Sequence, residues 1–191
     1  MFDESLIPVY DGTDFTITKE EVVVSASEVD WVVNKETKSI LRYKDDQFHF
    51  YYNDDTFGRL LTGDCITCGW DSKIADLYSG LAWGDILVLG LGLGVLPEYI
   101  KVNKNPTSID VIESDNEVIT VVDWLSSGIN VINANEFTYT PVKTYDIIIC
   151  ELWAENTDIT QDHKDSLLAN YSSHLKSGGA ILIPINSEIL S

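Results

Sequence analysis

The stretch Asp85-Ile-Leu-Val-Leu-Gly-Leu-Gly-Leu-Gly94 decides the fold of this 191-residue chain. Its first five residues form an apolar run typical of a buried β-strand, and three alternating glycines follow directly: Gly90, Gly92 and Gly94. A helix is predicted after this loop, because Pro97 is tolerated in a first helical turn. Glycines allow a sharp turn and let backbone N–H groups approach a bound nucleoside. A purely structural glycine-rich turn is the alternative interpretation.

Four further apolar runs alternate with segments that can form helices: Ser108–Glu113, Asn130–Ile132, Tyr145–Cys150 and Gly179–Ile183. The alternation predicts an α/β protein with a parallel sheet covered on both faces. Glu113 ends the second strand, 19 residues after Gly94, where an acid in a doubly wound sheet can accept both ribose hydroxyls. The alternative for Glu113 is a plain strand-end carboxylate.

The sequence up to about Gly80 has a different character, with short β-type runs separated by polar turns. Asn34–Lys38 and Lys44–Asp46 are typical of hairpin turns. We therefore expect an N-terminal antiparallel β domain at 1–80 and a nucleoside-binding domain at 81–191.

Five segments resemble, in order, the motifs of class I S-adenosylmethionine (SAM) dependent methyltransferases: Asp85–Gly94, Ile109–Ile119, Val131–Phe137, Tyr145–Glu151 and Leu175–Ile183. Within that superfamily they are most similar to spermidine synthase-like proteins. Gly58–Leu61, followed by Asp64, is similar to the β-hairpin element that precedes the catalytic domain of those synthases. The resemblance implies a Rossmann-like class I methyltransferase fold with a parallel sheet of order 3-2-1-4-5, the last strands missing, and an N-terminal antiparallel β extension.

The resemblance also implies which residues bind a cofactor: Gly90, Gly92, Gly94, Glu113, Ser114, Asn135 and Glu136. The glycines would pass under the nucleoside, Glu113 would hold the ribose, and Asn135 would accept from the adenine amino group through its carbonyl oxygen. Asn135 can also be read as a loop-entry residue. The implied cofactor is SAM or decarboxylated SAM, with S-adenosylhomocysteine or methylthioadenosine as the nucleoside product.

Glu151 follows the fourth strand of this domain, where the related aminopropyltransferases place an acid that helps to deprotonate the attacking amine. A carboxylate there could orient the amine or accept its proton. The resemblance therefore implies that Glu151 is catalytic and that a methyl or aminopropyl group is transferred to a small acceptor, a polyamine or another amine. A plain strand-end carboxylate is the alternative.

The sequence departs from the family pattern at three places. Val88 and Leu93 stand where family members carry the acids that hold the amino-acid end of the cofactor. Leu152-Trp153-Ala154-Glu155 differs from the family's D-S-x-D-P continuation, so that the second acid is displaced by one residue. A non-catalytic protein that keeps a truncated fold for nucleoside binding or assembly is therefore the rival interpretation. A nicotinamide-dependent oxidoreductase is disfavoured, because Val95 occupies the place of the third glycine in its fingerprint.

The formal net charge is −19, which disfavours nucleic acids and anionic membranes as partners. No run approaches the roughly 20 apolar residues that span a bilayer, and the first residues lack the features of a signal peptide. Three cysteines, Cys65, Cys68 and Cys150, cannot form an even disulfide framework, which favours a reducing compartment. Cys65 and Cys68 have C-x-x-C spacing, for which a redox pair is an alternative to small residues in a turn or strand, and no metal site is expected. We expect a cytoplasmic protein that forms a homo-oligomer, since Ala180–Ile183 would otherwise be an uncovered apolar edge.

Overall fold

The computed structural model describes residues 8–13, 15–26, 33–43, 80–152 and 160–183. The first of its two sheets contains three antiparallel strands: β1 (Tyr10–Asp11), β2 (Phe15–Ala26) and β3 (Val33–Tyr43). The second is built from β4 (Asp85–Leu89), β5 (Ser108–Glu113), β6 (Ile129–Asn133), β7 (Tyr145–Cys150) and β8 (Leu175–Leu182). The helices are α2 (Val95–Lys104), α3 (Asn116–Val121) and α4 (Gln161–Tyr171), with a short 3-10 turn, η2 (Ser172–His174), between α4 and β8.

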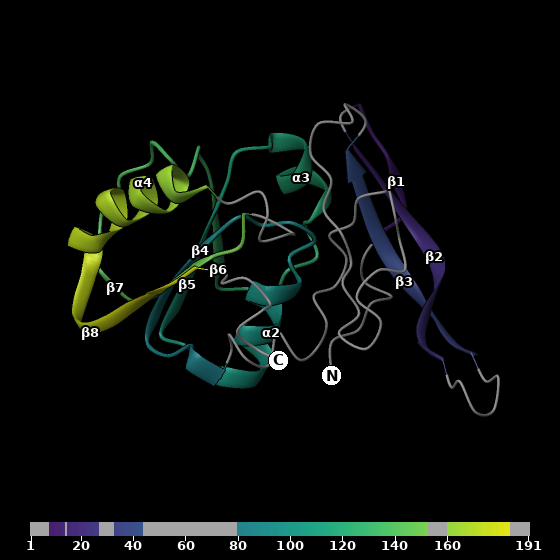
Figure 1. The fold of residues 1–191 in the computed structure, drawn as a ribbon, viewed down its shortest axis with the longest axis horizontal. Coiled ribbons are helices and arrows are strands. Elements are labelled where there is room, and N and C mark those ends of the chain that lie inside the picture. Colours follow the sequence, from purple (N-terminus) through teal and green to yellow (C-terminus); the bar gives the residue numbers. More distant parts are fainter. Residues whose placement is uncertain (1–7, 14, 27–32, 44–79, 153–159, 184–191) are drawn as a thin grey trace.

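The second sheet has the order β6-β5-β4-β7-β8, and every neighbouring pair is parallel. Counted along the domain, this is the order 3-2-1-4-5 of a Rossmann-like fold. The predicted α/β class, the strand order and the N-terminal antiparallel extension are therefore confirmed (Figure 1).

Helices cover both faces of the parallel sheet, because side chains alternate along each strand. Ile86 and Val88 of β4 belong to a buried cluster that includes residues of α2 and α3. Leu87 and Leu89 belong to the cluster on the other face, which contains Leu167 and Tyr171 of α4. Figure 1 shows α4 on one side of the sheet and α2 and α3 on the other.

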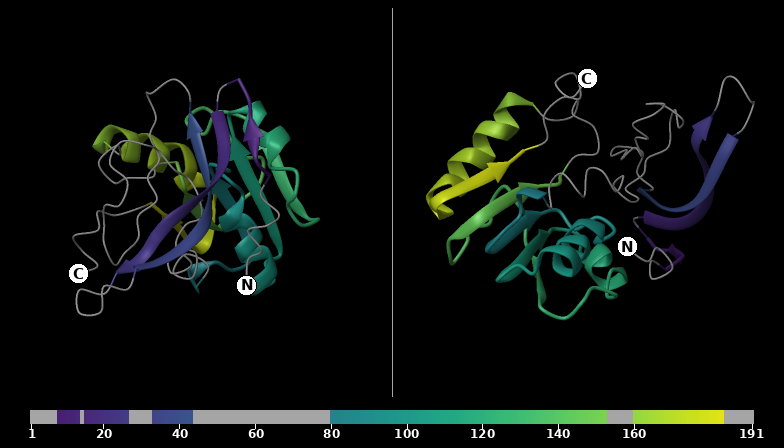
Figure 2. Two further views of the ribbon diagram at one scale, coloured as in Figure 1. Left: turned by 90° about the vertical axis from the view of Figure 1, so that its right-hand side faces the viewer. Right: turned by 90° about the horizontal axis from the view of Figure 1, so that it is seen from below.

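The N-terminal sheet lies beside α3 and contacts it (Figures 1 and 2). Ile17 of β2 is fully buried in the same cluster as the α3 side chains Val118 and Val121. The Glu117 Oε1 atom accepts hydrogen bonds from Tyr10 Oη, at 2.6 Å, and from the Thr13 N–H, at 2.8 Å. A hydrogen-bonded carboxylate and a buried isoleucine thus join the N-terminal sheet to α3.

Two local expectations differ from the structure. Asn34–Lys38 is part of β3 and pairs with Glu20–Ser25 in the antiparallel ladder, so the predicted turn there is wrong. A ladder is made by backbone groups, and polar residues can continue it. The last strand begins at Leu175 rather than at Gly179. Leu175 pairs with Tyr145 and Ala180 pairs with Ile147, so the residues between them, Lys176–Gly179, form an irregularity within the strand. The turn expected at Lys44–Asp46 and the hairpin motif at Gly58–Asp64 lie outside the described residues.

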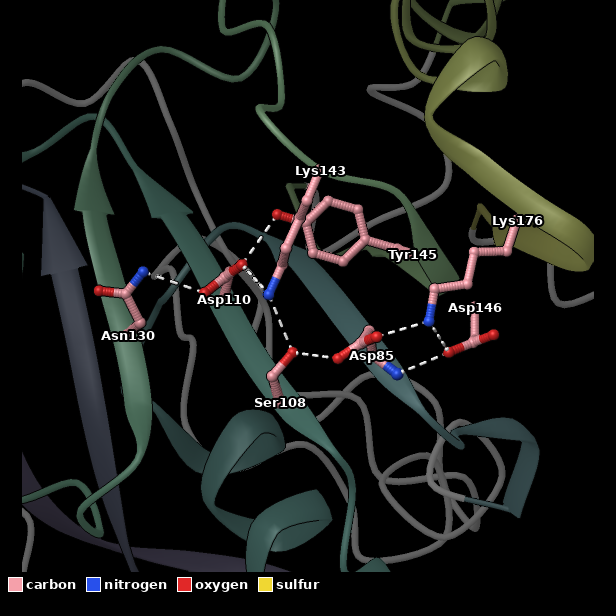
Figure 3. A network of polar contacts seen from close by, with 8 residues as sticks. All are labelled: Asp85, Ser108, Asp110, Asn130, Lys143, Tyr145, Asp146 and Lys176. Carbon is pink, nitrogen blue, oxygen red and sulfur yellow. Dashed lines mark hydrogen bonds and ion pairs between the residues drawn. The ribbon is translucent and has the colours of Figure 1, made fainter.

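A network of polar side chains joins the amino-terminal part of all five parallel strands (Figure 3). The Lys176 Nζ atom lies 2.5 Å from Asp85 Oδ2 and 2.7 Å from Asp146 Oδ2. In the second half of the network, Asp110 is bound by three donors: Lys143 Nζ at 2.9 Å, Tyr145 Oη at 2.8 Å and Asn130 Nδ2 at 3.0 Å. Ser108 connects the halves by donating to Asp85 and accepting from Lys143.

This network explains how acids are tolerated at positions that are nearly buried. The hydrogen bond from Lys176 lowers the pKa of Asp85 and that of Asp146. Burial opposes the ionisation of Asp110, but the hydrogen bonds from Lys143, Asn130 and Tyr145 outweigh it and lower its pKa as well. All three carboxylates are therefore stabilised in the charged form.

Among the described helices, none is long and apolar enough to cross a membrane.

The pKa shifts predict a pH dependence of stability. Asp85 and Asp146 titrate below their ordinary value of 3.8 in the folded chain, so they add stability above that pH, which is lost as the pH falls through the lowered pKa values. We expect Lys176→Ala to lower the free energy of unfolding at neutral pH and to flatten its decline in acid. Urea denaturation across the acid range measures both.

Lys164→Ala is the control, because it also removes one lysine charge, but from helix α4 rather than from the network. It should retain the wild-type decline in acid. A Lys176→Ala variant that loses stability as steeply as the wild type would contradict the assignment.

Candidate functional site

The glycine loop follows β4 at the point where the strand order reverses. Consecutive strands run from β4 to β5 and β6 on one side, and to β7 and β8 on the other. In open α/β sheets, ligands bind outside the carboxyl ends of the strands at such a switch point. The residues that follow β4, β5, β6 and β7 therefore define the candidate site.

Left-handed backbone conformations shape the loop. Gly90, Gly92 and Gly94 have φ angles of 94°, 51° and 76°, which residues with a side chain rarely adopt. The Gly90 N–H donates to the Ile112 carbonyl at 2.8 Å and the Gly94 N–H to the Leu91 carbonyl at 2.8 Å. Gly94 then caps α2, and Pro97 lies in its first turn as predicted.

Two of these glycines also allow close packing. A Cβ atom on Gly90 would lie 2.4 Å from the carbonyl oxygen of Glu151, and one on Gly94 would lie 2.7 Å from Val122 Cγ1. Real Cβ atoms essentially never come this close to other atoms. The loop therefore fits between the end of β7 and the segment after α3 only because it lacks side chains there.

Glu113 joins the loop to the turn after β5. Its Oε2 accepts from the Leu91 N–H at 3.0 Å and its Oε1 from the Asp115 N–H at 2.8 Å. Burial raises the pKa of Glu113, the two backbone hydrogen bonds oppose the rise, and the charges of Asp115 and Glu136 add to it. Each carboxylate oxygen can accept more than one hydrogen bond, so the group can still receive a pair of hydroxyls.

The remaining expected cofactor residues lie on the neighbouring turns. Ser114 is exposed, and its carbonyl accepts from Asn133 Nδ2 at 3.3 Å. Asn135 is exposed, and its Oδ1 accepts from the Phe137 N–H at 3.0 Å, so the predicted adenine acceptor is engaged in its own turn. The carbonyl of Glu136 accepts from Tyr171 Oη at 2.6 Å.

Glu151 stands at the end of β7, directly beside the glycine loop. Its N–H donates to the Leu89 carbonyl at 2.7 Å, and its side-chain Oε2 atom is buried. The preceding residue, Cys150, is fully buried, which raises the pKa of its thiol to about 12. Near neutral pH this thiol is protonated and is not a nucleophile.

The structure thus brings together Gly90, Glu113 and Glu151, and it places the charge of Glu136 close enough to act on Glu113. It records no contact between Asn135 and these carboxylates. Val88 and Leu93 are 0% and 3% exposed in the apolar core, so neither position presents a polar group to a ligand.

Sequence reasoning missed two backbone donors, those of Leu91 and Asp115. No side-chain signal marks Leu91, whereas Asp115 is recognisable as the N-cap of α3, accepting from the Glu117 and Val118 N–H groups. In the described part of the chain, no group of three or more His, Cys, Asp or Glu side chains could hold a metal ion. Four residues singled out above lie outside it: Cys65, Cys68, Trp153 and Glu155.

No protein-family model matches the chain, and no curated protein matches it. Solved structures do match. DhpI in complex with S-adenosylhomocysteine (SAH) is 18% identical over 58% of this chain and 54% of its own, with a TM-score of 0.48. A SAM-bound amino pentose methyltransferase from Micromonospora echinaspora, involved in calicheamicin biosynthesis, is 20% identical over 60% and 49%, with a TM-score of 0.48. The glycopeptide N-methyltransferase MtfA is 13% identical over 58% and 51%, with a TM-score of 0.47.

The chain spans about half the length of each of these proteins. The assignment of a Rossmann-like fold therefore rests on the strand order and register of its own parallel sheet.

Proposed function

We propose that the chain binds a SAM-type nucleoside at the carboxyl edge of the parallel sheet and transfers a methyl or aminopropyl group from it to a small amine-bearing acceptor. One observation carries the proposal: the Glu113 carboxylate is held by backbone N–H groups from both flanking turns, beside a loop with three left-handed glycines. This combination presents a fixed pair of acceptor oxygens next to a loop that has no side chains at Gly90, Gly92 and Gly94, as a ribose and its nucleoside require.

The proposed binding roles follow from this placement. Glu113, with Ser114 beside it, receives the ribose hydroxyls, and the glycine loop passes under the nucleoside. Glu136 and Asn135 line the adenine side, where the Asn135 carbonyl oxygen, which already accepts from the Phe137 N–H, has a second lone pair for the adenine amino group. Decarboxylated SAM is included as a candidate cofactor because of the resemblance of the sequence to spermidine synthase-like proteins, which transfer an aminopropyl group.

Glu151 is the proposed catalytic residue. When bound, the sulfonium of the cofactor supplies an electrophilic carbon. The carboxylate of Glu151 would orient an acceptor amine toward that carbon or accept its proton. Its position at the end of β7, one residue beyond the buried Cys150 and against Gly90, supports this role. The net charge of −19 suits a cationic acceptor such as a polyamine.

A second candidate function is nucleoside binding without group transfer. It is favoured by the burial of Val88 and Leu93, which leaves the amino-acid end of SAM without a counterpart at those positions. In this case methylthioadenosine binds as tightly as SAM, and no transfer occurs.

Glu113→Gln tests the nucleoside site. The amide cannot accept from both backbone donors and a ribose together, and a hydrogen bond to a charged group contributes about 1.5–3 kcal/mol, so we expect affinity to fall by about 10- to 100-fold. Isothermal titration with SAM, decarboxylated SAM and methylthioadenosine measures it. Glu117→Gln is the matched control, since this acid binds Tyr10 and Thr13 instead. A wild-type protein that binds none of the three nucleosides would contradict the proposal.

The raised pKa of Glu113 predicts the direction of a pH effect on binding. Ribose hydroxyls donate to the ionised carboxylate, and burial lifts its pKa above the ordinary value of 4.5, so affinity should fall as the pH decreases through the raised value. Methylthioadenosine is the suitable probe because it has no amino-acid group to titrate. The dissociation constant, followed from neutral pH down to about pH 4, should rise for the wild type and stay level for Glu113→Gln. A wild-type profile that stays level over this range would argue against a role for the Glu113 charge in binding.

Glu151→Gln separates transfer from binding. We expect it to keep nucleoside affinity within about threefold and to slow transfer by about 100-fold or more, because general-base catalysis contributes about that much. Single-turnover assays with SAM or decarboxylated SAM and putrescine as the acceptor probe measure the step. Equal rates for the variant and the wild type would remove Glu151 from the chemistry. Tight binding without detectable transfer in the wild type would favour the second candidate function.

A further inference from the structure

A buried acid outside the candidate site connects α2 to the segment that follows α3. Glu98 is 7% exposed, and its carboxylate accepts two hydrogen bonds from one residue, Ser126. The Ser126 N–H donates to Oε2 at 2.7 Å, and the Ser126 hydroxyl donates to Oε1 at 2.5 Å. Both carboxylate oxygens thus bind the same residue, Ser126, which lies in a segment without regular secondary structure.

This segment, Val122–Ser126, forms the surface against which the glycine loop packs. The position that a Cβ of Gly94 would take lies 2.7 Å from Val122 Cγ1, 2.8 Å from Leu125 Cδ2 and 3.4 Å from Trp124 Cζ2. The side chains of the segment therefore pack so closely against Gly94 that they leave no room for a Cβ atom there. A displacement of the segment would leave that glycine without support.

Gly94 is in turn connected to the proposed ribose carboxylate. Its N–H donates to the Leu91 carbonyl at 2.8 Å, and the N–H of Leu91 donates to Glu113 Oε2 at 3.0 Å. The direction in which Leu91 presents its N–H depends on the conformation of the turn that Gly94 closes. Glu98 is thus connected to the site in three steps. It holds Ser126, the segment that contains Ser126 packs against Gly94, and Gly94 closes the turn from which Leu91 donates to Glu113.

An acid is a costly residue for this position. The other buried residues of α2 are apolar: Val95, Leu96, Pro97 and Ile100. An apolar side chain at 98 would avoid the desolvation of a carboxylate, but it could not fix the backbone N–H and the hydroxyl of Ser126 together. We propose that Glu98 is a positioning residue that sets the geometry of the glycine loop for nucleoside binding. This inference rests on the proposed function.

The experiment compares affinity with stability. Glu98→Ala removes both hydrogen bonds, and we expect the affinity for methylthioadenosine to fall by about tenfold or more at a temperature well below the unfolding midpoint. Glu98→Gln should stay within about threefold of wild type, because its amide can accept from the Ser126 N–H and donate to the Ser126 hydroxyl oxygen. Titration calorimetry gives the affinity, and thermal denaturation gives the midpoint.

Leu167→Ala provides the matched control. Leu167 is fully buried on the opposite face of the sheet, so the variant lowers stability without touching the loop. It should lower the midpoint and leave affinity unchanged. If Glu98→Ala also lowers the midpoint but binds like the wild type, Glu98 is only structural and the inference is overturned.

Two further outcomes are distinguishable. If Glu98→Ala does not fold, Ser126→Ala is the decisive variant, because it removes only the hydrogen bond from the hydroxyl. A loss of about threefold in affinity supports the inference, whereas wild-type affinity overturns it. Wild-type protein that binds no nucleoside at all removes the proposed function and the inference with it. Wild-type binding combined with an unaffected Glu98→Ala removes the inference alone.

Discussion

The carboxylate of Glu113 is the constraint on which the arrangement of the carboxyl edge depends. It accepts N–H groups from the glycine loop and from the turn that begins α3, so one side chain holds two backbone segments in register with the end of β5. Because these hydrogen bonds fix the carboxylate in the free protein, little ordering would be required of this half of the proposed site on binding. The charge remains buried near Asp115 and Glu136, and this repulsion favours a ligand that brings hydrogen-bond donors.

The two edges of the parallel sheet use charge in opposite ways. At the amino edge, Lys143 and Lys176 neutralise the acids that surround them, and the network spans all five strands (Figure 3). At the carboxyl edge, backbone N–H groups are the recorded donors to Glu113. Lysine side chains thus hold the acids at the amino edge, whereas backbone groups hold Glu113 at the carboxyl edge, where the proposed site lies.

The fold could be predicted from sequence because apolar runs such as Asp85–Leu89 and Tyr145–Cys150 are buried on both faces and alternate with helical segments, which together favour a covered parallel sheet. The turn expected at Asn34–Lys38 was wrong, since polar residues continue a ladder as readily as they form a turn when a partner strand lies opposite. In the site, glycines and strand-end acids carry a side-chain signal. The donors on Glu113 are backbone atoms, and the pairing of Glu98 with Ser126 joins residues 28 apart, which no local pattern reveals.

The ion pair between Lys176 and Asp85 also bears on how the chain reaches its native state. These residues are 91 positions apart, and they link the first and last strands of the described parallel sheet. Contacts of such long sequence separation close large loops and slow folding. During synthesis, Asp85 of the central strand β4 therefore lacks its Lys176 partner until β8 has been made, and only then can the ion pairs of the described sheet all form.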